Sequence, residues 1–221
     1  LDRLPEGPSS LERDLFPGLA AKGTLGGKVY QGMFIDIGVP EDLARSQELL
    51  AAWRRKAAVF FDRDGVINID HGYVHTPENF HWIQGAIEAV KLANDLGYLA
   101  ILITNQAGIA RGYYEEAAFR SLMDWVEEEL RRHGAHFDAV YFCPHHPTAG
   151  QGEYRIQCDC RKPAPGLILR AAREWSIELE NSFFIGDKES DLAAARAAEV
   201  APVLFTDQHN LLALIEHYLR R

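Results

Sequence analysis

The chain has 221 residues, a formal net charge of −9 and 25% charged residues, a balance typical of a soluble globular protein with one sizeable core and an appendage. The acidic charge argues against a nucleic-acid partner, which would require a basic surface. Because we find neither an apolar run of roughly 20 residues nor a signal segment, we expect no membrane partner and a cytoplasmic location.

Residues 1–56 differ in composition from the rest of the chain. A glycine-rich turn at 23–27 leads into a strand-like pair, Val29 and Tyr30. Pro40 and the two acidic residues after it suit the first turn of a helix that extends to about Lys56, where basic residues suit the last turn. The segment has too few apolar residues to fold alone, so we expect it to pack on another part of the protein.

Residues 57–221 alternate between strand and helix patterns. Continuous apolar runs predict strands that are buried on both faces, and apolar residues spaced three and four apart predict the helices between them. This order indicates an α/β fold with a Rossmann-like parallel sheet flanked by helices, and with the chemistry at the carboxyl ends of the strands. The expected strands are 57–61, 98–103, 139–142, 183–186 and 203–205.

Two aspartates follow the first of these strands. Alternate residues of a strand share a face, so Asp62 and Asp64 should project together, and Gly65 allows the backbone to turn away. Paired carboxylates form a hard-oxygen site for Mg²⁺, and one of them can act as a nucleophile without a base. Taken alone, Asp-x-Asp-Gly is more often an ordinary turn.

Three more polar clusters follow predicted strands or precede a helix. The second, Thr104, Asn105 and Gln106, offers a hydroxyl and amides for phosphate oxygens, and the third, Arg161 and Lys162, offers two cations. The fourth holds Asp187, which could complete the Mg²⁺ site, with Lys188 beside it and Asp191 as a supporting carboxylate. Each cluster alone has an ordinary reading as a turn or a solvated pair.

The three cysteines lie close together in the polar segment 143–163. Cys143 and His145, followed by Cys158 and Cys160, supply the four ligands of a closed tetrahedral Zn²⁺ site. His146 is the alternative histidine. A four-ligand site leaves no open position, so we assign this zinc to structure, where it would order the loop that carries Arg161 and Lys162.

Together, the four clusters resemble the motifs of the haloacid dehalogenase (HAD) superfamily of phosphotransferases. The resemblance implies that Asp62 is the nucleophile and Asp64 the general acid/base, that Thr104 and Lys162 bind phosphate, and that the Mg²⁺ ligands are Asp62, Asp64 and Asp187. The short connection between the first two motifs has no room for the cap domain of many relatives.

The zinc loop and the missing cap narrow the resemblance to the D-glycero-D-manno-heptose 1,7-bisphosphate 7-phosphatases. Val66 departs from the threonine that is frequent there. In that family, the stretch Asp-His-Gly-Tyr and the Arg-Lys pair contact a sugar phosphate, in a pathway that makes nucleotide-activated heptose for lipopolysaccharide or other surface polysaccharides. The implied substrate-binding residues are Asp70, His71, Gly72, Tyr73, Thr104, Asn105, Gln106, Arg161, Lys162 and Lys188.

Residues 1–56 resemble the C-terminal tail of a sugar nucleotidyltransferase, through motifs such as Phe34-Ile35-Asp36-Ile37-Gly38. The parent protein could thus be a bifunctional nucleotidyltransferase-phosphatase, a hint that favours the α anomer of the sugar. We expect a monomer. The alternatives are a histidinol-phosphate phosphatase, which shares the nucleophile and zinc loop, another small sugar-phosphate phosphatase, and a noncatalytic sugar-phosphate-binding module.

Overall fold

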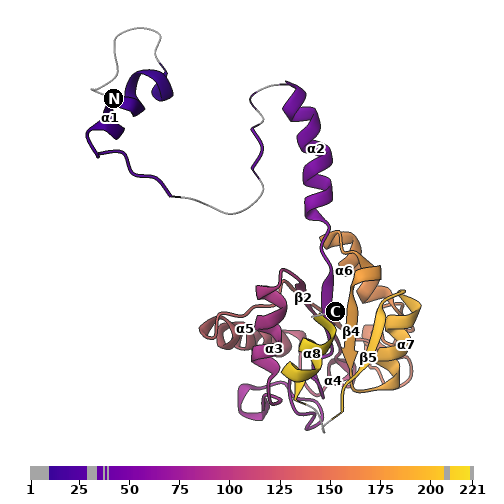
Figure 1. The fold of residues 1–221 in the computed structure, drawn as a ribbon. Coiled ribbons are helices and arrows are strands. Elements are labelled where there is room, and N and C mark those ends of the chain that lie inside the picture. Colours follow the sequence, from indigo (N-terminus) through magenta and orange to yellow (C-terminus); the bar gives the residue numbers. More distant parts are fainter. Residues whose placement is uncertain (1–9, 29–33, 37, 39, 207–209, 220–221) are drawn as a thin grey trace. The chain divides into compact units, whose positions relative to one another are not determined.

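The computed structural model describes residues 10–28, 34–36, 38, 40–206 and 210–219. The chain divides into two units, residues 1–47 and 48–221, and each is described here by itself (Figure 1). Among the described helices, none combines the length and the apolar character that crossing a membrane requires.

The first unit contains short helical segments. The π-helical turn η1 (Leu11–Leu15) and helix α1 (Phe16–Ala21) follow each other directly, and the Ser10 hydroxyl accepts a hydrogen bond from the backbone N–H of Arg13 at 3.3 Å. The helix expected from Pro40 is confirmed as α2 (Pro40–Arg54), which crosses the boundary between the units. The strand expected at Val29 and Tyr30 lies outside the described residues.

The second unit contains the predicted five-stranded sheet. All strand pairs are parallel, and the order across the sheet is β3-β2-β1-β4-β5. The strands are β1 (Ala58–Phe61), β2 (Leu99–Asn105), β3 (Ala139–Cys143), β4 (Phe183–Gly186) and β5 (Ala201–Leu204). The connecting helices are α3 (Ala86–Asp95), α4 (Ala107–Ala110), α5 (Glu116–Arg132), α6 (Gly166–Trp175), α7 (Glu189–Ala197) and α8 (Leu211–Leu219), with 3₁₀ turns η2 (Pro77–Asn79), η3 (Gly152–Tyr154) and η4 (Leu179–Asn181).

Helices cover both faces of the sheet, which explains why its central strand is apolar at every position. Val59 and Phe61 of β1 pack into the core under α3, α5 and α8, whereas Ala58 and Phe60 pack into the core under α6 and α7. Successive residues of a strand point to opposite faces, so a strand covered on both sides has no solvent-facing position. Figure 1 shows the two groups of helices on opposite sides of the strands.

The buried stripe of α3 differs from the predicted one. The spacing of Ile83, Ile87, Val90 and Leu96 in the sequence predicts a helical stripe that stops at Gly97, but the helix begins only at Ala86 and ends at Asp95, and Leu96 is 49% exposed. Small side chains instead form the buried face, which lets the helix pack closely on the sheet. These residues are Ala86, Ala89, Val90 and Ala93.

The strand order places a change of direction at β1. The chain runs outward from β1 to β2 and β3 and then crosses over to β4 and β5. The connections that follow the neighbouring strands β1 and β4 therefore run in opposite directions across the sheet. Ligands of open parallel sheets bind at such a point. Between β1 and β2, the described residues form only η2, α3 and connecting loops, which agrees with the expected lack of a cap domain.

Candidate active site

A pocket of about 450 Å³ opens at the carboxyl end of the sheet, within the size range of small-molecule sites. It collects residues from the end of β2, from the start of α7, from the loops after β1, β2, α4 and β4, and from the loop before α6. Its lining comprises Asp62, Asp64, Asp70, Gly72, Tyr73, Thr104, Asn105, Gln106, Ala107, Tyr114, Arg161, Lys162, Lys188, Ser190 and Asp191. Of the predicted site residues outside the zinc loop, only His71 and Asp187 do not line it.

Lys162 joins the first and fourth motifs in the floor of the pocket. Its ammonium group lies 2.7 Å from Oδ1 of Asp62 and 2.8 Å from Oδ1 of Asp191, and it donates a third hydrogen bond to the carbonyl of Ile103 at 3.1 Å. All three of its donors are therefore used. Asp191 also accepts from the backbone N–H of Lys188 through Oδ2, which makes it a support for Lys162 and for the start of α7.

The two oxygens of Asp62 have different surroundings. Oδ1 bonds to Lys162 and accepts the backbone N–H of Arg63 at 2.7 Å. Among the described residues, Oδ2 has no hydrogen-bond partner. This oxygen is thus available to a metal ion or to an electrophile in the pocket.

Asp187 approaches Asp62 from the end of β4, where Gly65 makes room for it. Ligand atoms of Asp62, Asp187 and Asp191 all lie within 4.8 Å of one another. A Cβ atom on Gly65 would lie 2.2 Å from Oδ2 of Asp187, and Gly65 has a φ of +94°. Oδ1 of Asp187 is buried without a hydrogen-bond partner. An orphaned carboxylate oxygen beside a second carboxylate suits a divalent cation.

The carboxylates in this site outnumber the cations. Burial is the main cause that raises the pKa of Asp62 to about 7; Asp191 and Asp64 add to the rise, and Lys162 opposes it. Burial likewise raises the pKa of Asp187. Although burial opposes it, attraction to Asp62 and Asp191 raises the pKa of Lys162, which therefore stays charged. A bound Mg²⁺ would balance the remaining negative charge.

Asp64 is held by side chains that are themselves buried. The guanidinium of Arg63, which is 0% exposed, lies 2.8 Å from Oδ1 of Asp64 and also donates to the carbonyl of Val74 at 2.7 Å. Asn68 donates to the same oxygen at 3.1 Å, and Gln106 donates to Oδ2 at 3.3 Å. Asp64 therefore faces the pocket in one defined orientation.

Asn105 and Gln106 have protein partners in this structure. The amide of Asn105 both donates to the carbonyl of Lys162 and accepts its backbone N–H, each at 3.1 Å. Gln106 donates to Thr104 and accepts from Tyr114. Both side chains hold other members of the site, and their predicted phosphate contacts remain a prediction.

The loop after β1 forms one wall of the pocket. Lys188 lies 2.9 Å from Asp70, and Asp70 also accepts the backbone N–H of Gly72. Tyr73, with a φ of +55°, packs edge-on against Tyr113 at a centroid distance of 4.7 Å. His71 lies outside the pocket lining, where its Nε2 is 3.1 Å from Nδ1 of His81.

The four predicted zinc ligands gather in the loop after β3. The Sγ atoms of Cys143, Cys158 and Cys160 lie 3.2 to 3.6 Å apart, and Nδ1 of His145 lies 3.4 and 3.8 Å from Cys160 and Cys143. Tetrahedral ligands at zinc distances are separated by about 3.5–3.8 Å, so this cluster can hold such an ion. His146 instead accepts backbone N–H groups of residues 148 and 149 through Nδ1.

The cluster is linked directly to the pocket. The guanidinium of Arg161 donates to the carbonyl of His145 at 3.1 Å, and Arg161 and Lys162 follow Cys160 in the chain. Ordering the Cys/His loop therefore also orients the two cations at the pocket.

Sequence reasoning did not identify Arg63, Tyr114 and Ser190 as parts of the site. Arg63 stands between the two aspartates but reads as an ordinary surface cation, since arginine is rarely fully buried. Tyr114 lies beyond α4 in a segment without a motif, so the sequence holds no signal for it. Ser190 could have been included because it lies between Lys188 and Asp191.

Known proteins provide an independent comparison. A family model described as HAD-hydrolase-like matches residues 159–214. A D-glycero-β-D-manno-heptose-1,7-bisphosphate 7-phosphatase of Pasteurella multocida is 49% identical over 145 residues, which are 66% of this chain and 78% of the relative. The protein of the same name from Vibrio cholerae is 44% identical over 181 residues, covering 75% of this chain and 97% of the relative.

A solved structure extends the comparison to the fold. The D,D-heptose 1,7-bisphosphate phosphatase of B. bronchiseptica, complexed with magnesium and phosphate, matches with a TM-score of 0.65 and 28% identity, over 74% of this chain and 98% of that one. The predicted HAD-like fold is therefore confirmed.

Proposed function

The chain belongs to the D-glycero-β-D-manno-heptose-1,7-bisphosphate 7-phosphatase family, and from this membership we propose that it removes the C7 phosphate of a heptose 1,7-bisphosphate. The observation that carries the proposal is the meeting of Asp62, Asp187 and Lys162 at the ends of β1 and β4, where Asp62 and Lys162 line the pocket and Asp187 lies beside Asp62. An anionic sugar phosphate suits a pocket that also contains Arg161 and Lys188.

Mg²⁺ is the cofactor that fits this site. Asp62, the backbone carbonyl of Asp64 and Asp187 would hold it, and the unpartnered Oδ1 of Asp187 supports that assignment. When bound, the ion supplies positive charge that balances the phosphate and the clustered carboxylates.

Asp62 is the proposed nucleophile. Its Oδ2 attacks phosphorus in line with the bond to the sugar oxygen at C7, the new O–P bond forms, and the bond to the sugar breaks. Asp64 gives its proton to the departing sugar oxygen. Asp64 then takes a proton from water as that water attacks the aspartyl-phosphate, which releases inorganic phosphate and regenerates Asp62.

The residues around the phosphate position it and stabilise its charge. Thr104 would donate its hydroxyl proton to a phosphate oxygen, and Lys162 balances the charge beside Asp62. Asn105 fixes the backbone of Lys162 with two hydrogen bonds, so its contribution can be indirect. Lys188 and the loop that contains Asp70 would contact the sugar.

Arg161 is the candidate for the second phosphate of the substrate. Its guanidinium can grip a phosphate through two parallel hydrogen bonds, and the carbonyl of His145 holds it at the pocket. This contact would favour bisphosphates over monophosphates. His71 would have to leave His81 to reach the pocket, so its predicted substrate contact is the least supported of the set.

We assign structural Zn²⁺ to Cys143, His145, Cys158 and Cys160. The spacing of their ligand atoms supports zinc, and the backbone bonds of His146 argue for His145 as the fourth ligand. Three thiols held for a metal require a reducing compartment, which supports the cytoplasm as the location.

The predicted role of residues 1–56 stays a proposal. They resemble a nucleotidyltransferase tail, and the relatives named above match 66% and 75% of this chain. The bifunctional parent protein rests on this resemblance. The proposed monomeric state would be tested by size-exclusion chromatography of the full chain. The names of both relatives specify the β anomer, in contrast with the hint towards the α anomer from the tail.

A phosphate-release panel tests the proposed function. Both anomers of the heptose bisphosphate, histidinol phosphate and fructose bisphosphate are compared with and without Mg²⁺, and we expect one heptose anomer with Mg²⁺ to be the best substrate. Faster turnover of histidinol phosphate would favour the alternative phosphatase. Heptose bisphosphate binding without phosphate release would favour the noncatalytic binding module.

A further inference from the structure

We propose that Tyr114 and Gln106 form a positioning pair that directs the hydroxyl of Thr104 and the carboxylate of Asp64 toward the bound phosphate. The inference rests on the proposed function and deepens it. Tyr114 and Gln106 would act through Thr104 and Asp64, which lie near the nucleophile, and they need not touch the substrate.

Gln106 is the centre of a short buried network. Its side chain is 2% exposed, and its Oε1 accepts the hydroxyl of Tyr114 at 2.6 Å. On the other side, Nε2 donates to Oγ1 of Thr104 at 2.8 Å and to Oδ2 of Asp64 at 3.3 Å. The amide thus connects two functional groups of the pocket to a tyrosine outside the motifs.

The direction of this amide determines what Thr104 can do. Because Nε2 donates to Oγ1, the threonine hydroxyl keeps its own proton free to donate to another acceptor, and Thr104 faces the pocket. If the amide were reversed, Oε1 would take that proton and would also face the carboxylate of Asp64, which only accepts hydrogen bonds while it is ionised. On the far side the hydroxyl of Tyr114 donates to Oε1 and anchors the amide, while the ionised carboxylate of Asp64 disfavours the reversed direction.

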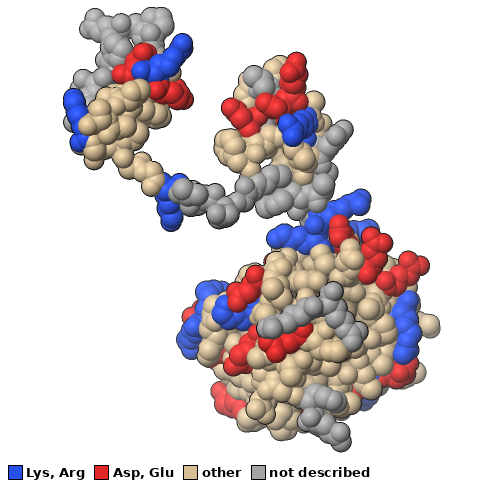
Figure 2. Space-filling view, viewed as in Figure 1, with Lys and Arg blue, Asp and Glu red and all other residues tan. Residues whose placement is uncertain are grey.

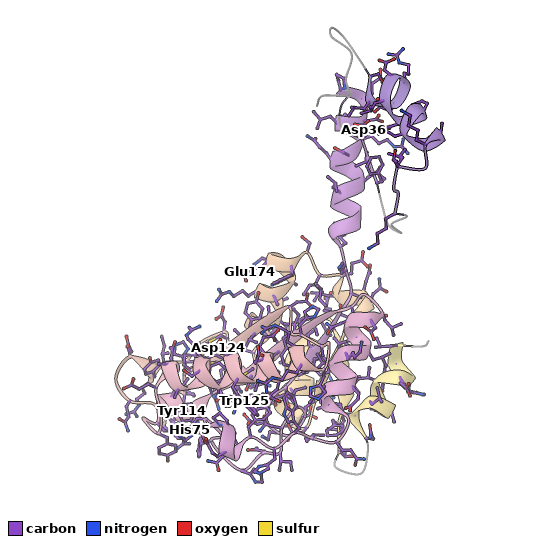
Figure 3. All side chains as sticks on the ribbon, turned by 90° about the vertical axis from the view of Figure 1, so that its left-hand side faces the viewer. Asp36, His75, Tyr114, Asp124, Trp125 and Glu174 are labelled. Atoms are coloured by element: carbon purple, nitrogen blue, oxygen red, sulfur yellow. The ribbon has the colours of Figure 1, made fainter. Side chains whose placement is uncertain are left out.

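Tyr114 is itself held firmly. It is 9% exposed and stacks on His75 with ring centroids 4.6 Å apart and planes 8° apart (Figure 3). Nδ1 of His75 lies 2.8 Å from the carbonyl of Tyr73. Gly108 leaves space for the ring, since a Cβ there would lie 2.2 Å from a ring carbon. Burial raises the pKa of Tyr114 to about 12, so the phenol retains its proton at any working pH.

Single and double variants test the pair on the full chain with Mg²⁺. Tyr114→Phe removes one hydroxyl and should lower kcat about fivefold, the effect of one ordinary hydrogen bond. Gln106→Met should lower kcat about 100-fold, because Thr104 and Asp64 both lose their orientation. KM should change less than threefold in each. If Tyr114 acts through Gln106, adding Tyr114→Phe to Gln106→Met should cause no further loss.

Tyr113→Phe is the matched control. It removes the hydroxyl of the adjacent tyrosine, for which the described residues offer no hydrogen-bond partner, and kcat should stay within twofold of the wild type. Tyr114→Phe with a kcat equal to that of this control would overturn the proposal. So would independent losses that multiply in the double variant, or a loss confined to KM.

Two substrates separate this inference from the proposed function. All variants are assayed with heptose 1,7-bisphosphate and with p-nitrophenyl phosphate. A wild-type protein that hydrolyses only p-nitrophenyl phosphate would refute the proposed substrate, while the kcat pattern on that ester would still decide the role of the pair. Normal heptose turnover with unaffected variants would refute the pair alone.

Discussion

Replacing Gly65 with alanine should damage the metal site as well as strain the backbone. The new Cβ would lie 2.2 Å from Oδ2 and 2.5 Å from Cγ of Asp187, so the carboxylate would have to move by about 1 Å to reach an ordinary contact. Displacements of this size cost on the order of 100-fold in rate at a reacting centre. We therefore expect kcat to fall about 100-fold and the Mg²⁺ concentration at half-maximal activity to rise at least tenfold.

Gly97→Ala provides the control for backbone strain. Gly97 has a φ of +82°, close to the +94° of Gly65, but a Cβ there would have nothing within 4 Å. In each variant the left-handed backbone should lower the free energy of unfolding by about 1–2 kcal/mol. This loss lowers the melting temperature by about 2–8 °C in a chain of this size. Only Gly65→Ala should also change the response to Mg²⁺.

The assays are a Mg²⁺ titration of phosphate release and a thermal melt in excess Mg²⁺. Equal Mg²⁺ dependence for Gly65→Ala and Gly97→Ala, together with equal losses of melting temperature, would show that Asp187 does not need the space beside residue 65. The reasoning that places Asp187 in the metal site would then be refuted.

Other substitutions examine the remaining parts of the site. Asp62→Asn should reduce turnover by at least about 10³-fold with the melting temperature maintained, and appreciable residual phosphate release would count against Asp62 as the nucleophile. His145→Ala should lose bound zinc, measured by elemental analysis, and lower the melting temperature, whereas His146→Ala should keep one zinc per chain; the reverse result would reassign the ligand. Arg161→Ala should cost about 10²-fold in kcat/KM for the bisphosphate but little for a monophosphate, and an unchanged preference would remove Arg161 from recognition of the second phosphate.

The surface of the second unit is mixed in charge on the face shown in Figure 2, where Lys and Arg lie interspersed with Asp and Glu. The net charge of −9 therefore coexists with locally placed cations. Lys162 illustrates this, because a single cation between Asp62 and Asp191 remains charged although it is buried. Local partners, more than the total charge, determine how an acidic protein can accept a phosphate.

The amino-acid sequence alone was sufficient to predict the parallel sheet and the locations of its motifs. Apolar runs such as Ala58–Phe61 must be covered on both faces, and parallel strands bring their carboxyl ends to one edge. For this reason the sequence predicts that Asp62 and Asp187 meet. The clustered cysteines likewise pointed to a metal loop, because thiols with this spacing in a polar segment have few other uses.

Only the tertiary structure decided which polar atoms pair with one another. Asn105 and Gln106 read as phosphate ligands in the sequence, yet their amides bond to Lys162, Thr104 and Tyr114. His145 and His146 are neighbours in the chain, and only the fold brings the first to the cysteines. Strand patterns depend on local periodicity, whereas a hydrogen bond depends on distances of a few tenths of an ångström between segments that are remote in sequence.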